Sequence, residues 1–433
     1  RARQRKAPQS QDKAQLASAW AAAGHLPKLD AKLIEKALPG GKAQIGAYEV
    51  TRVLGEGEFA TVYSCVRKSG EGTGAKVACK AIKKSKVERA RGGSILKAKR
   101  NIGRVNLEVE AMNRLRHEGV CRLYEVVQSS SYVYCFIEAG ERDLFSFLDG
   151  HPRGCPEPVV VAIARIAALA LRHCHQRGIA HRDVKPENVL VLGSPATWGK
   201  GLPDAGIIKL CDFGLCADIS GGHELTDFVG SPGFFAPELF CEASYRGDLA
   251  DAWSLGSVVL ECVLGHRAFD DLWCPPYDDL KDPNAFRDAV DAAVGRVKLG
   301  GPNGPLPPKL SSLVSNLLRV DPKIRPPRCF NVTHPTATLP VHVHPGATVT
   351  DMCSRPEFDL MRPDKDGCMS MLRLTYDHTP RLEEITVARR KAFTSRSSLK
   401  TSPGGDLSDA SVVSTSCESP TNFPDIPKVT PGK

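Results

Sequence analysis

The 433-residue sequence lacks several features that assign a protein to a broad class at first sight. Its 15 cysteines include no CxxC pair, and this odd number of scattered thiols favours a reducing compartment over a disulfide framework. The apolar run 159–171 is interrupted by Arg165, so no membrane span is expected. No apolar segment follows the basic start, so no signal peptide is expected, and a start on Arg1 instead of methionine is compatible with a fragment. We expect a protein of the cytoplasm, the nucleus or both.

Positively charged residues are only in moderate excess over negatively charged ones, with a formal net charge of +9. Part of this excess lies in residues 1–6, and because basic chain ends are usually solvated tails, direct nucleic-acid binding is not expected. Hydrophobic residues make up 42% of the chain and charged residues 25%, a composition typical of packed domains.

The most informative stretch is residues 181–188, which read H-R-D-V-K-P-E-N. At this spacing Asp183 can accept the proton of an attacking hydroxyl, Lys185 can neutralise a transferring phosphoryl group, and Asn188 can hold a divalent metal. The full pattern resembles the catalytic loop of the eukaryotic protein kinase family, and the lysine at 185 resembles its serine/threonine branch. The resemblance covers about residues 48–330.

A second pattern is a glycine-rich stretch, where Gly55 and Gly57 permit the tight turn and close backbone approach that cover phosphates. Ala60 replaces the third glycine of the kinase pattern, and taken alone G-x-G-x-x-A also fits a dinucleotide-binding loop. It is not a Walker A loop, because no Gly-Lys-Ser/Thr follows. Lys80 in V-A-C-K separates these options, since it matches the kinase strand lysine of V-A-I-K. The resemblance then assigns nine residues to a loop over ATP: Leu54, Gly55, Glu56, Gly57, Glu58, Phe59, Ala60, Thr61 and Val62.

By the same resemblance, Lys80 contacts the α- and β-phosphates of ATP and pairs with a glutamate on the following helix. Helical periodicity is visible over residues 107–115, whereas the very basic segment 85–104 is expected to be a loop. Counting along the family pattern selects Glu108 for the pair. Glu110 would project from another face, because two residues correspond to about 200° around a helix.

Residues 126–138 alternate as two strands around a serine-rich turn. The resemblance places the hinge that hydrogen-bonds adenine at Glu138 to Gly140, with Ile137 as the gatekeeper, although this hinge is one residue shorter than the family pattern. Asp143 would lie near the ribose and the basic side of a substrate. The alternative is that Asp143 caps the helix that begins after it.

Asp212 stands in the tripeptide D-F-G, 29 residues after Asp183 and directly after a predicted strand at residues 207–210. The resemblance implies that Asp212 chelates the Mg²⁺ that bridges the ATP phosphates. In the G-S-P turn that follows, Ser231 is expected to contact Asp183 and Lys185.

The activation segment lacks a phosphorylatable residue at the position that the family pattern favours. Arg182 usually meets a phosphorylated side chain there, but the residue three before the glycine of G-S-P is Asp227. We therefore interpret Asp227 as a built-in negative charge, although a carboxylate carries less charge than a phosphate. Thr226 and Ser220 remain candidate sites for an upstream kinase.

Other residues of the pattern are expected to be structural. Asp251 would brace the backbone of the catalytic loop, and His181 would pack against the metal-binding segment. Glu238 in A-P-E would pair with Arg325.

These patterns predict an α+β, two-lobed protein kinase fold with ATP in the cleft. The small lobe, a sheet with one main helix, is expected at 48–138, and the larger, mainly helical lobe at 139–330. The Gly- and Pro-rich segment 193–206 is expected to be a surface insertion. The remaining segments are a basic N-terminal extension at 1–44, for which a flanking helix and a mobile arm fit equally well, an uncharacterised extension at 331–393, and a disordered Ser/Thr/Pro-rich tail at 394–433.

The resemblance implies an ATP- and Mg²⁺-dependent kinase that phosphorylates Ser or Thr of protein substrates in intracellular signalling. Within the family the sequence is most similar to the calmodulin-dependent/Snf1-like group. Glu187 and Asp143 predict a preference for arginine upstream of the target. A pseudokinase is disfavoured because Lys80, Asp183 and Asp212 are all present. A small-molecule kinase of related fold is disfavoured by the intact A-P-E and G-S-P segments.

Overall fold

The computed structural model divides the chain into two units. The first contains the described residues up to 116 together with 121–140, and the second contains 117–120 and the described residues from 141 onward. The structure describes residues 10–22, 24–30, 32–37, 43–89, 94–192, 208–278, 280–298, 300 and 304–325. The expected insertion at 193–206 and the segments 331–393 and 394–433 lie outside these residues.

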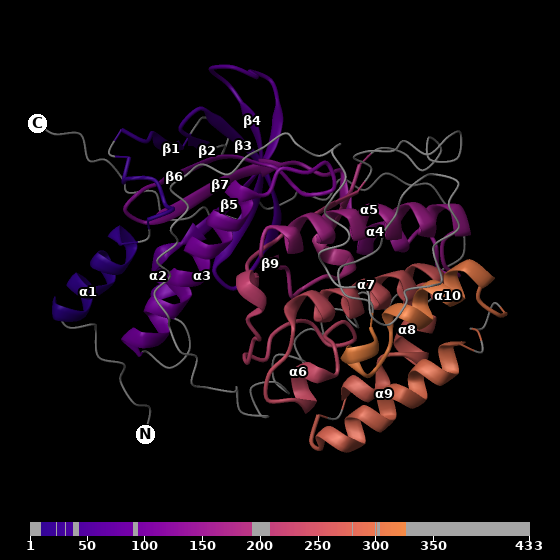
Figure 1. The fold of residues 1–433 in the computed structure, drawn as a ribbon. Helices are drawn as coiled ribbons and strands as arrows, with labels where there is room; N and C mark the ends of the chain where they lie inside the picture. Colours follow the sequence, from indigo (N-terminus) through magenta and orange to yellow (C-terminus); the bar gives the residue numbers. More distant parts are fainter. Residues whose placement is uncertain are drawn as a thin grey trace, which may run out of the picture. The chain divides into compact units, whose positions relative to one another are not determined.

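The first unit is built on a seven-stranded antiparallel sheet with the strand order β1-β2-β3-β4-β5-β7-β6 (Figure 1). Alternation along the strands buries one face, and the rings of Tyr48 and Phe136 stack there with their centroids 3.7 Å apart. β5 lies near the middle of the sheet, which fixes the backbone around Lys80 on both sides. The strands are β1 (Glu35–Ala37), β2 (Ala43–Ile45), β3 (Tyr48–Glu56), β4 (Ala60–Arg67), β5 (Lys76–Lys83), β6 (Leu123–Gln128) and β7 (Tyr132–Glu138).

Three helices accompany this sheet: α1 (Ser10–Ala21), α2 (Lys84–Glu88) and α3 (Ile95–Arg114). The expectation of a loop at 85–104 was wrong, because α2 and the first half of α3 occupy most of that segment. The reason is an apolar stripe at helical spacing, formed by Ala98, Ile102 and Val105, that many basic residues conceal in the sequence. The N-terminal extension contains a helix and also supplies the two strands β1 and β2 to the sheet.

The second unit is mainly helical, and its core is α7, in which every residue except Val263 is buried. α5 and α10 both pack against α7. α8 and α9 lie between α7 and α10 along the chain. The helices are α4 (Leu144–Leu148), α5 (Glu157–Gln176), α6 (Glu238–Cys241), α7 (Gly247–Leu264), α8 (His266–Leu272), α9 (Pro283–Lys298) and α10 (Pro308–Leu317).

Helix α5 is long and apolar enough to cross a membrane by length and composition alone, and it is the one such helix in the described parts of the chain. However, 61% of its apolar window is buried inside the protein. Together with the packing of α5 against α7, this burial is typical of a core helix.

Two small sheets hold the loops of the second unit in place. The first has the order β11-β10-β8 and the second pairs β12 with β9. The residues 181–188 therefore run from the end of one small sheet into the other, through the short 3-10 turn η2. The strands and this turn are β8 (Arg142–Asp143), β9 (Ile179–Ala180), β10 (Val189–Val191), β11 (Ile208–Leu210), β12 (Ala217–Asp218) and η2 (Pro186–Asn188).

Candidate active site

The catalytic loop is held by Asp251, a fully buried residue of α7. Its carboxylate accepts hydrogen bonds from the backbone N–H groups of His181 (2.8 Å) and Arg182 (2.7 Å), as the sequence predicted. His175 Nε2 of α5 lies 2.7 Å from the same carboxylate. Burial by itself raises the pKa of Asp251, but the hydrogen bond from His175 and the nearby histidines outweigh it, so the pKa lies below its usual value.

These bonds also stabilise an unusual backbone. Arg182 has a φ of 66°, in the left-handed region that costs a non-glycine residue about 1 kcal/mol. The hydrogen bonds that the backbone N–H groups of His181 and Arg182 donate to the charged carboxylate of Asp251 offset that cost. The turn directs the side chain of the preceding His181 toward the next segment, where its Nε2 lies 3.0 Å from the carbonyl oxygen of Cys211 and its ring lies 4.7 Å from that of Phe213.

Three polar side chains converge on Asp183. Lys185 Nζ lies 3.0 Å from Asp183 Oδ2, and the hydroxyl of Ser231 donates to Asp183 Oδ1 over 2.7 Å. Lys185 Nζ also donates to Ser231 Oγ over 2.8 Å, so Ser231 makes both contacts that the sequence predicted. The amide of Asn188 donates to the backbone oxygen of Asp183 (2.8 Å) and to its Oδ2 (3.0 Å).

This network stabilises the charged form of Lys185. Burial lowers the pKa of Lys185, but the carboxylates of Asp183 and Glu187 outweigh the burial, so its pKa lies above the usual value. Lys185 is therefore a fixed positive charge beside a carboxylate. Chemically, the arrangement offers a proton acceptor whose orientation is set by three donors.

Asp212 follows β11, and Asn188 directly precedes β10, the strand that pairs with β11. The backbone N–H of Cys211 donates to the carbonyl oxygen of Asn188 over 2.9 Å, which ties the two segments together. Asp212 has a φ of 59°, and its Oδ1 accepts the N–H of Gly214 over 3.3 Å. Phe213 is fully buried, as expected of this tripeptide. Because the NH₂ of Asn188 bonds to Asp183, its side-chain oxygen and the exposed carboxylate of Asp212 are the groups suited to a hard cation such as Mg²⁺.

The activation segment is attached to the catalytic loop by Arg182. Its guanidinium donates to Asp227 Oδ1 over 2.5 Å and to the carbonyl oxygen of Leu215 over 2.7 Å. Tyr245, which the sequence analysis did not single out, accepts from Arg182 over 3.2 Å and donates to the backbone oxygen of Asp227 over 2.9 Å. Burial lowers the pKa of Arg182, but Tyr245 and Asp227 outweigh it and raise the pKa. The second carboxylate oxygen of Asp227 is buried with no hydrogen-bond partner among the described residues.

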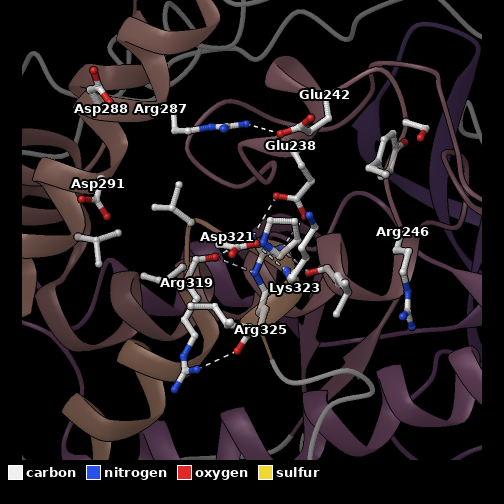
Figure 2. Close-up of a pocket in the computed structure, with 18 of the residues that line it drawn as sticks. Glu238, Glu242, Arg246, Arg287, Asp288, Asp291, Arg319, Asp321, Lys323 and Arg325 are labelled. Atoms are coloured by element: carbon white, nitrogen blue, oxygen red, sulfur yellow. Dashed lines mark hydrogen bonds and ion pairs between the residues drawn. The ribbon is translucent and has the colours of Figure 1, made fainter. Parts of the chain in front are cut away.

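Glu238 and Arg325 form the buried ion pair that the sequence predicted (Figure 2). The contact is bidentate, with distances of 2.6 Å and 3.0 Å, and the guanidinium carbon also lies 5.0 Å from the centre of the Trp253 ring. The pair borders a pocket of about 910 Å³. Six acidic and six basic residues line this pocket, so it favours no ligand of one charge.

In the first unit, Lys80 of β5 pairs with Glu108 of α3. The distance between Lys80 Nζ and Glu108 Oε1 is 2.5 Å, and the two side chains are 19% and 6% exposed. Glu110, the alternative partner, instead lies 3.6 Å from Arg114 and 3.2 Å from His25. The pair that the family pattern selected in the sequence is therefore the pair found.

The glycine-rich stretch is the turn between β3 and β4. The backbone N–H of Gly57 donates to the carbonyl oxygen of Ala60 over 2.8 Å, which closes a tight hairpin. Residues 54–58 are exposed and therefore accessible to a ligand, whereas Phe59 is half-buried. In the predicted hinge, the N–H of Glu138 donates to the carbonyl oxygen of Arg122 over 2.9 Å, and Gly140 ends the described part of this unit. The adenine contact of residues 138–140 stays a prediction.

Asp143 lies in the second unit, where β8 pairs with β10. Its Oδ1 accepts the backbone N–H of Ser146 over 2.7 Å, so Asp143 is the N-cap of α4. This was the alternative interpretation of the residue. A contact with the ribose stays a prediction.

The fold and the residues around Asp183 define the class of protein. Residues 48–335 match the protein kinase domain family, which is two thirds of the chain, and the chain belongs to that family. The expected two-lobed α+β kinase fold is thereby confirmed. Members of this family use ATP together with divalent metal ions.

Individual relatives narrow the resemblance. The chain is 38% identical to CBL-interacting protein kinase 4 of Oryza sativa subsp. japonica over 248 residues, or 56% of this chain and 50% of the relative. It is 34% identical to maternal embryonic leucine zipper kinase of Danio rerio over 283 residues, 64% of this chain and 36% of the relative. It is 32% identical to sucrose non-fermenting protein kinase 1 of Fusarium virguliforme over 232 residues, 54% of this chain and 30% of the relative. The expected similarity to the Snf1-like group is confirmed, and the chain spans half or less of the length of these relatives.

Proposed function

We propose that this chain is an ATP-dependent protein kinase that transfers the γ-phosphoryl group of Mg·ATP to Ser or Thr hydroxyls of protein substrates. The observation that carries the proposal is the convergence of Lys185, Ser231 and Asn188 on the carboxylate of Asp183. A structural ion pair needs no hydroxyl and no amide at the same carboxylate, whereas a proton acceptor that must be oriented does. The kinship with serine/threonine kinases supports the same assignment.

In the proposed reaction, Asp183 orients the substrate hydroxyl and accepts its proton. The hydroxyl oxygen forms a bond to the γ-phosphorus, and the bond from that phosphorus to the bridging oxygen of ADP breaks. Lys185 offsets negative charge on the transferring group, since its own charge is maintained by Asp183 and Glu187. Lys80, oriented by Glu108, holds the α- and β-phosphates beneath the loop 54–62.

Asn188 and Asp212 are proposed to hold Mg²⁺. Both offer oxygen donors, and the backbone bond from Cys211 to Asn188 keeps their segments adjacent. When bound, the metal supplies positive charge to the phosphate oxygens. Most of the catalysis is then positioning and electrostatic stabilisation by the side chains already named.

The proposal is tested by transfer of ³²P from [γ-³²P]ATP to a Ser/Thr peptide in the presence of Mg²⁺. Asp183→Asn and Lys80→Met are each expected to abolish transfer. Lys83→Met is the matched control and is expected to keep transfer. Lys83 lies on the same strand β5 but outside the motif, and its side chain lies over the ring of Tyr132. Transfer that survives Asp183→Asn would contradict the assignment of the proton acceptor. Measurable ATP binding without any transfer by the wild-type chain, with or without prior phosphorylation, would favour a scaffold protein instead.

We further propose that substrates carry an arginine before the target residue. Glu187 in η2 and Asp143 in β8 belong to two elements that contact each other, which brings two acidic residues close to the catalytic loop. A cationic side chain upstream of the target hydroxyl would be attracted to them. An array of Ser/Thr peptides that differ only at upstream positions tests this, and equal phosphorylation with arginine and with alanine there would refute it. Thr226 and Ser220 are exposed and therefore accessible to an upstream kinase.

A further inference from the structure

The N-terminal segment 10–37 contacts several elements of the first unit. α1 contacts α3, and Lys99 Nζ of α3 donates to Gln15 Oε1 of α1 over 3.3 Å. Farther along the segment, Glu35 of β1 accepts a hydrogen bond of 3.0 Å from the hydroxyl of Tyr134 of β7. A helix of 12 residues is marginal in water by itself, so α1 depends on these tertiary contacts.

Trp20 is the anchor of this segment. It is only 7% exposed, and its indole N–H donates to Glu88 Oε1 at the end of α2 over 2.8 Å. The face of its ring covers a buried cation, because Lys84 Nζ lies 5.2 Å from the ring centre. Lys84 is 8% exposed and donates to Gln128 Oε1 (2.7 Å) and to the carbonyl oxygen of Ser129 (2.8 Å). Trp20 thereby completes the environment of a charge that the sheet only partly satisfies.

The same segment touches the elements that carry both members of the Lys80–Glu108 ion pair. Lys84 directly follows β5, the strand of Lys80, so Trp20 contacts the end of the strand that carries the lysine of the pair. α1 contacts α3, the helix that carries the glutamate of the pair, Glu108. His25 Nε2, 3.2 Å from Glu110 Oε2, adds a contact only two residues beyond Glu108.

We propose that residues 10–37, anchored by Trp20, position α3 against β5 and so set the Lys80–Glu108 ion pair for phosphoryl transfer. Trp20 is a positioning residue, because its hydrogen bond goes to Glu88 and its ring faces Lys84, so it acts through Lys84, α2 and α3. The inference rests on the kinase activity proposed above. Detachment of Trp20 is expected to weaken the binding of ATP as well as the rate of transfer.

The test uses the full chain with Trp20→Ala, Trp20→Phe and Glu108→Gln, and with Trp20→Ala combined with Glu108→Gln. A ring over a desolvated cation and one buried hydrogen bond together correspond to a change of about 10- to 100-fold in an equilibrium constant. Trp20→Ala is therefore expected to lower kcat/KM for ATP by roughly that factor, and to weaken the binding of a fluorescent ATP analogue in parallel. Trp20→Phe keeps a ring over Lys84 and is expected to recover part of both losses. Lys13→Ala, at an exposed position of α1, is the matched control and is expected to change neither.

The double variant separates positioning from plain stabilisation of the fold. If Trp20 acts through Glu108, Trp20→Ala adds little once Glu108 is replaced, less than about threefold. Wild-type kinetics in Trp20→Ala would overturn the inference, and so would a full additional loss in the Glu108→Gln background. The binding of the ATP analogue is measured without turnover. A wild-type chain that binds it but transfers no phosphate would therefore refute the proposed function while leaving the role of Trp20 measurable. Thermal melting shows whether each variant folds. If Trp20→Ala does not fold, its kinetic comparison with the wild type is made instead with Trp20→Phe and with Gln15→Ala, which removes the hydrogen bond between α1 and Lys99.

Discussion

The pair formed by Arg182 and Asp227 predicts that the kinase is active without phosphorylation of its activation segment. Asp227→Asn removes the negative charge and leaves the shape of the side chain almost unchanged. The Arg182 side chain is 6% exposed and that of Asp227 15%, so the guanidinium would lose its one charged partner among the described residues in a largely dry environment. We expect the activation segment to lose its attachment to the catalytic loop and the rate of phosphoryl transfer to fall.

The size of the effect follows from what remains around Arg182. Breaking a buried ion pair by removing one partner costs about 3–5 kcal/mol. Arg182 keeps its hydrogen bonds to the carbonyl oxygen of Leu215 and to the hydroxyl of Tyr245, at 2.7 Å and 3.2 Å, so the loss is smaller than this range. A loss of about 2 kcal/mol corresponds to a decrease of about 30-fold in the population with an attached activation segment. The value of kcat/KM for a peptide is expected to fall by up to the same factor.

The assay compares kcat/KM of phosphatase-treated wild-type, Asp227→Asn and Thr226→Ala chains. Thr226 is the matched control, because it is adjacent in sequence, exposed, and able to carry a phosphate. We expect Thr226→Ala to keep the full rate and Asp227→Asn to lose it, together with faster proteolytic cleavage of the activation segment. The opposite pattern, a full rate in Asp227→Asn and collapse in Thr226→Ala, would refute the built-in charge and identify Thr226 as the switch.

Three further variants test the second unit. Glu238→Gln leaves the fully buried Arg325 without its charged partner and is expected to lower the free energy of unfolding in urea by about 3–5 kcal/mol; a change below about 1 kcal/mol would contradict this. Ser231→Ala removes a charge-assisted hydrogen bond to the proton acceptor and is expected to lower kcat about tenfold or more with little change in KM for ATP, whereas an effect on KM alone would contradict it. Burial lowers the pKa of His266, but its hydrogen bond with Glu261 and the charge of that residue outweigh the burial and raise the pKa. The stabilisation by His266 is therefore complete below its unfolded pKa of 6.5 and is lost as the pH rises through the folded pKa. The difference in stability between the wild type and His266→Gln should shrink as the pH rises above 6.5, and a constant difference would refute the reasoning.

The sequence by itself determined the family, the fold class and the small set of polar residues around Asp183. Lys185 and Asn188 could be found because the motif H-R-D-x-K-x-x-N places them within one short loop, where spacing along the chain sets their geometry, whereas Ser231 followed from the family pattern. The family pattern selected Glu108 as the partner of Lys80, and helical periodicity then excluded Glu110, because a residue two positions farther along a helix points from another face. Pairs such as Glu238 with Arg325 followed from the family pattern, and the structure brings them into contact.

Only the tertiary structure decided the features that depend on contacts between distant residues. The first half of α3 was missed because its basic residues are as numerous as its apolar ones, and the stripe of Ala98, Ile102 and Val105 has meaning only when a neighbouring surface buries it. The role of Tyr245 beside Arg182 left no local signal, because 63 residues separate the two. For Trp20 the physical reason is the same. A lone aromatic in an Ala-rich segment shows no periodicity, and its importance arises only when folding brings it 5.2 Å from the buried cation of Lys84.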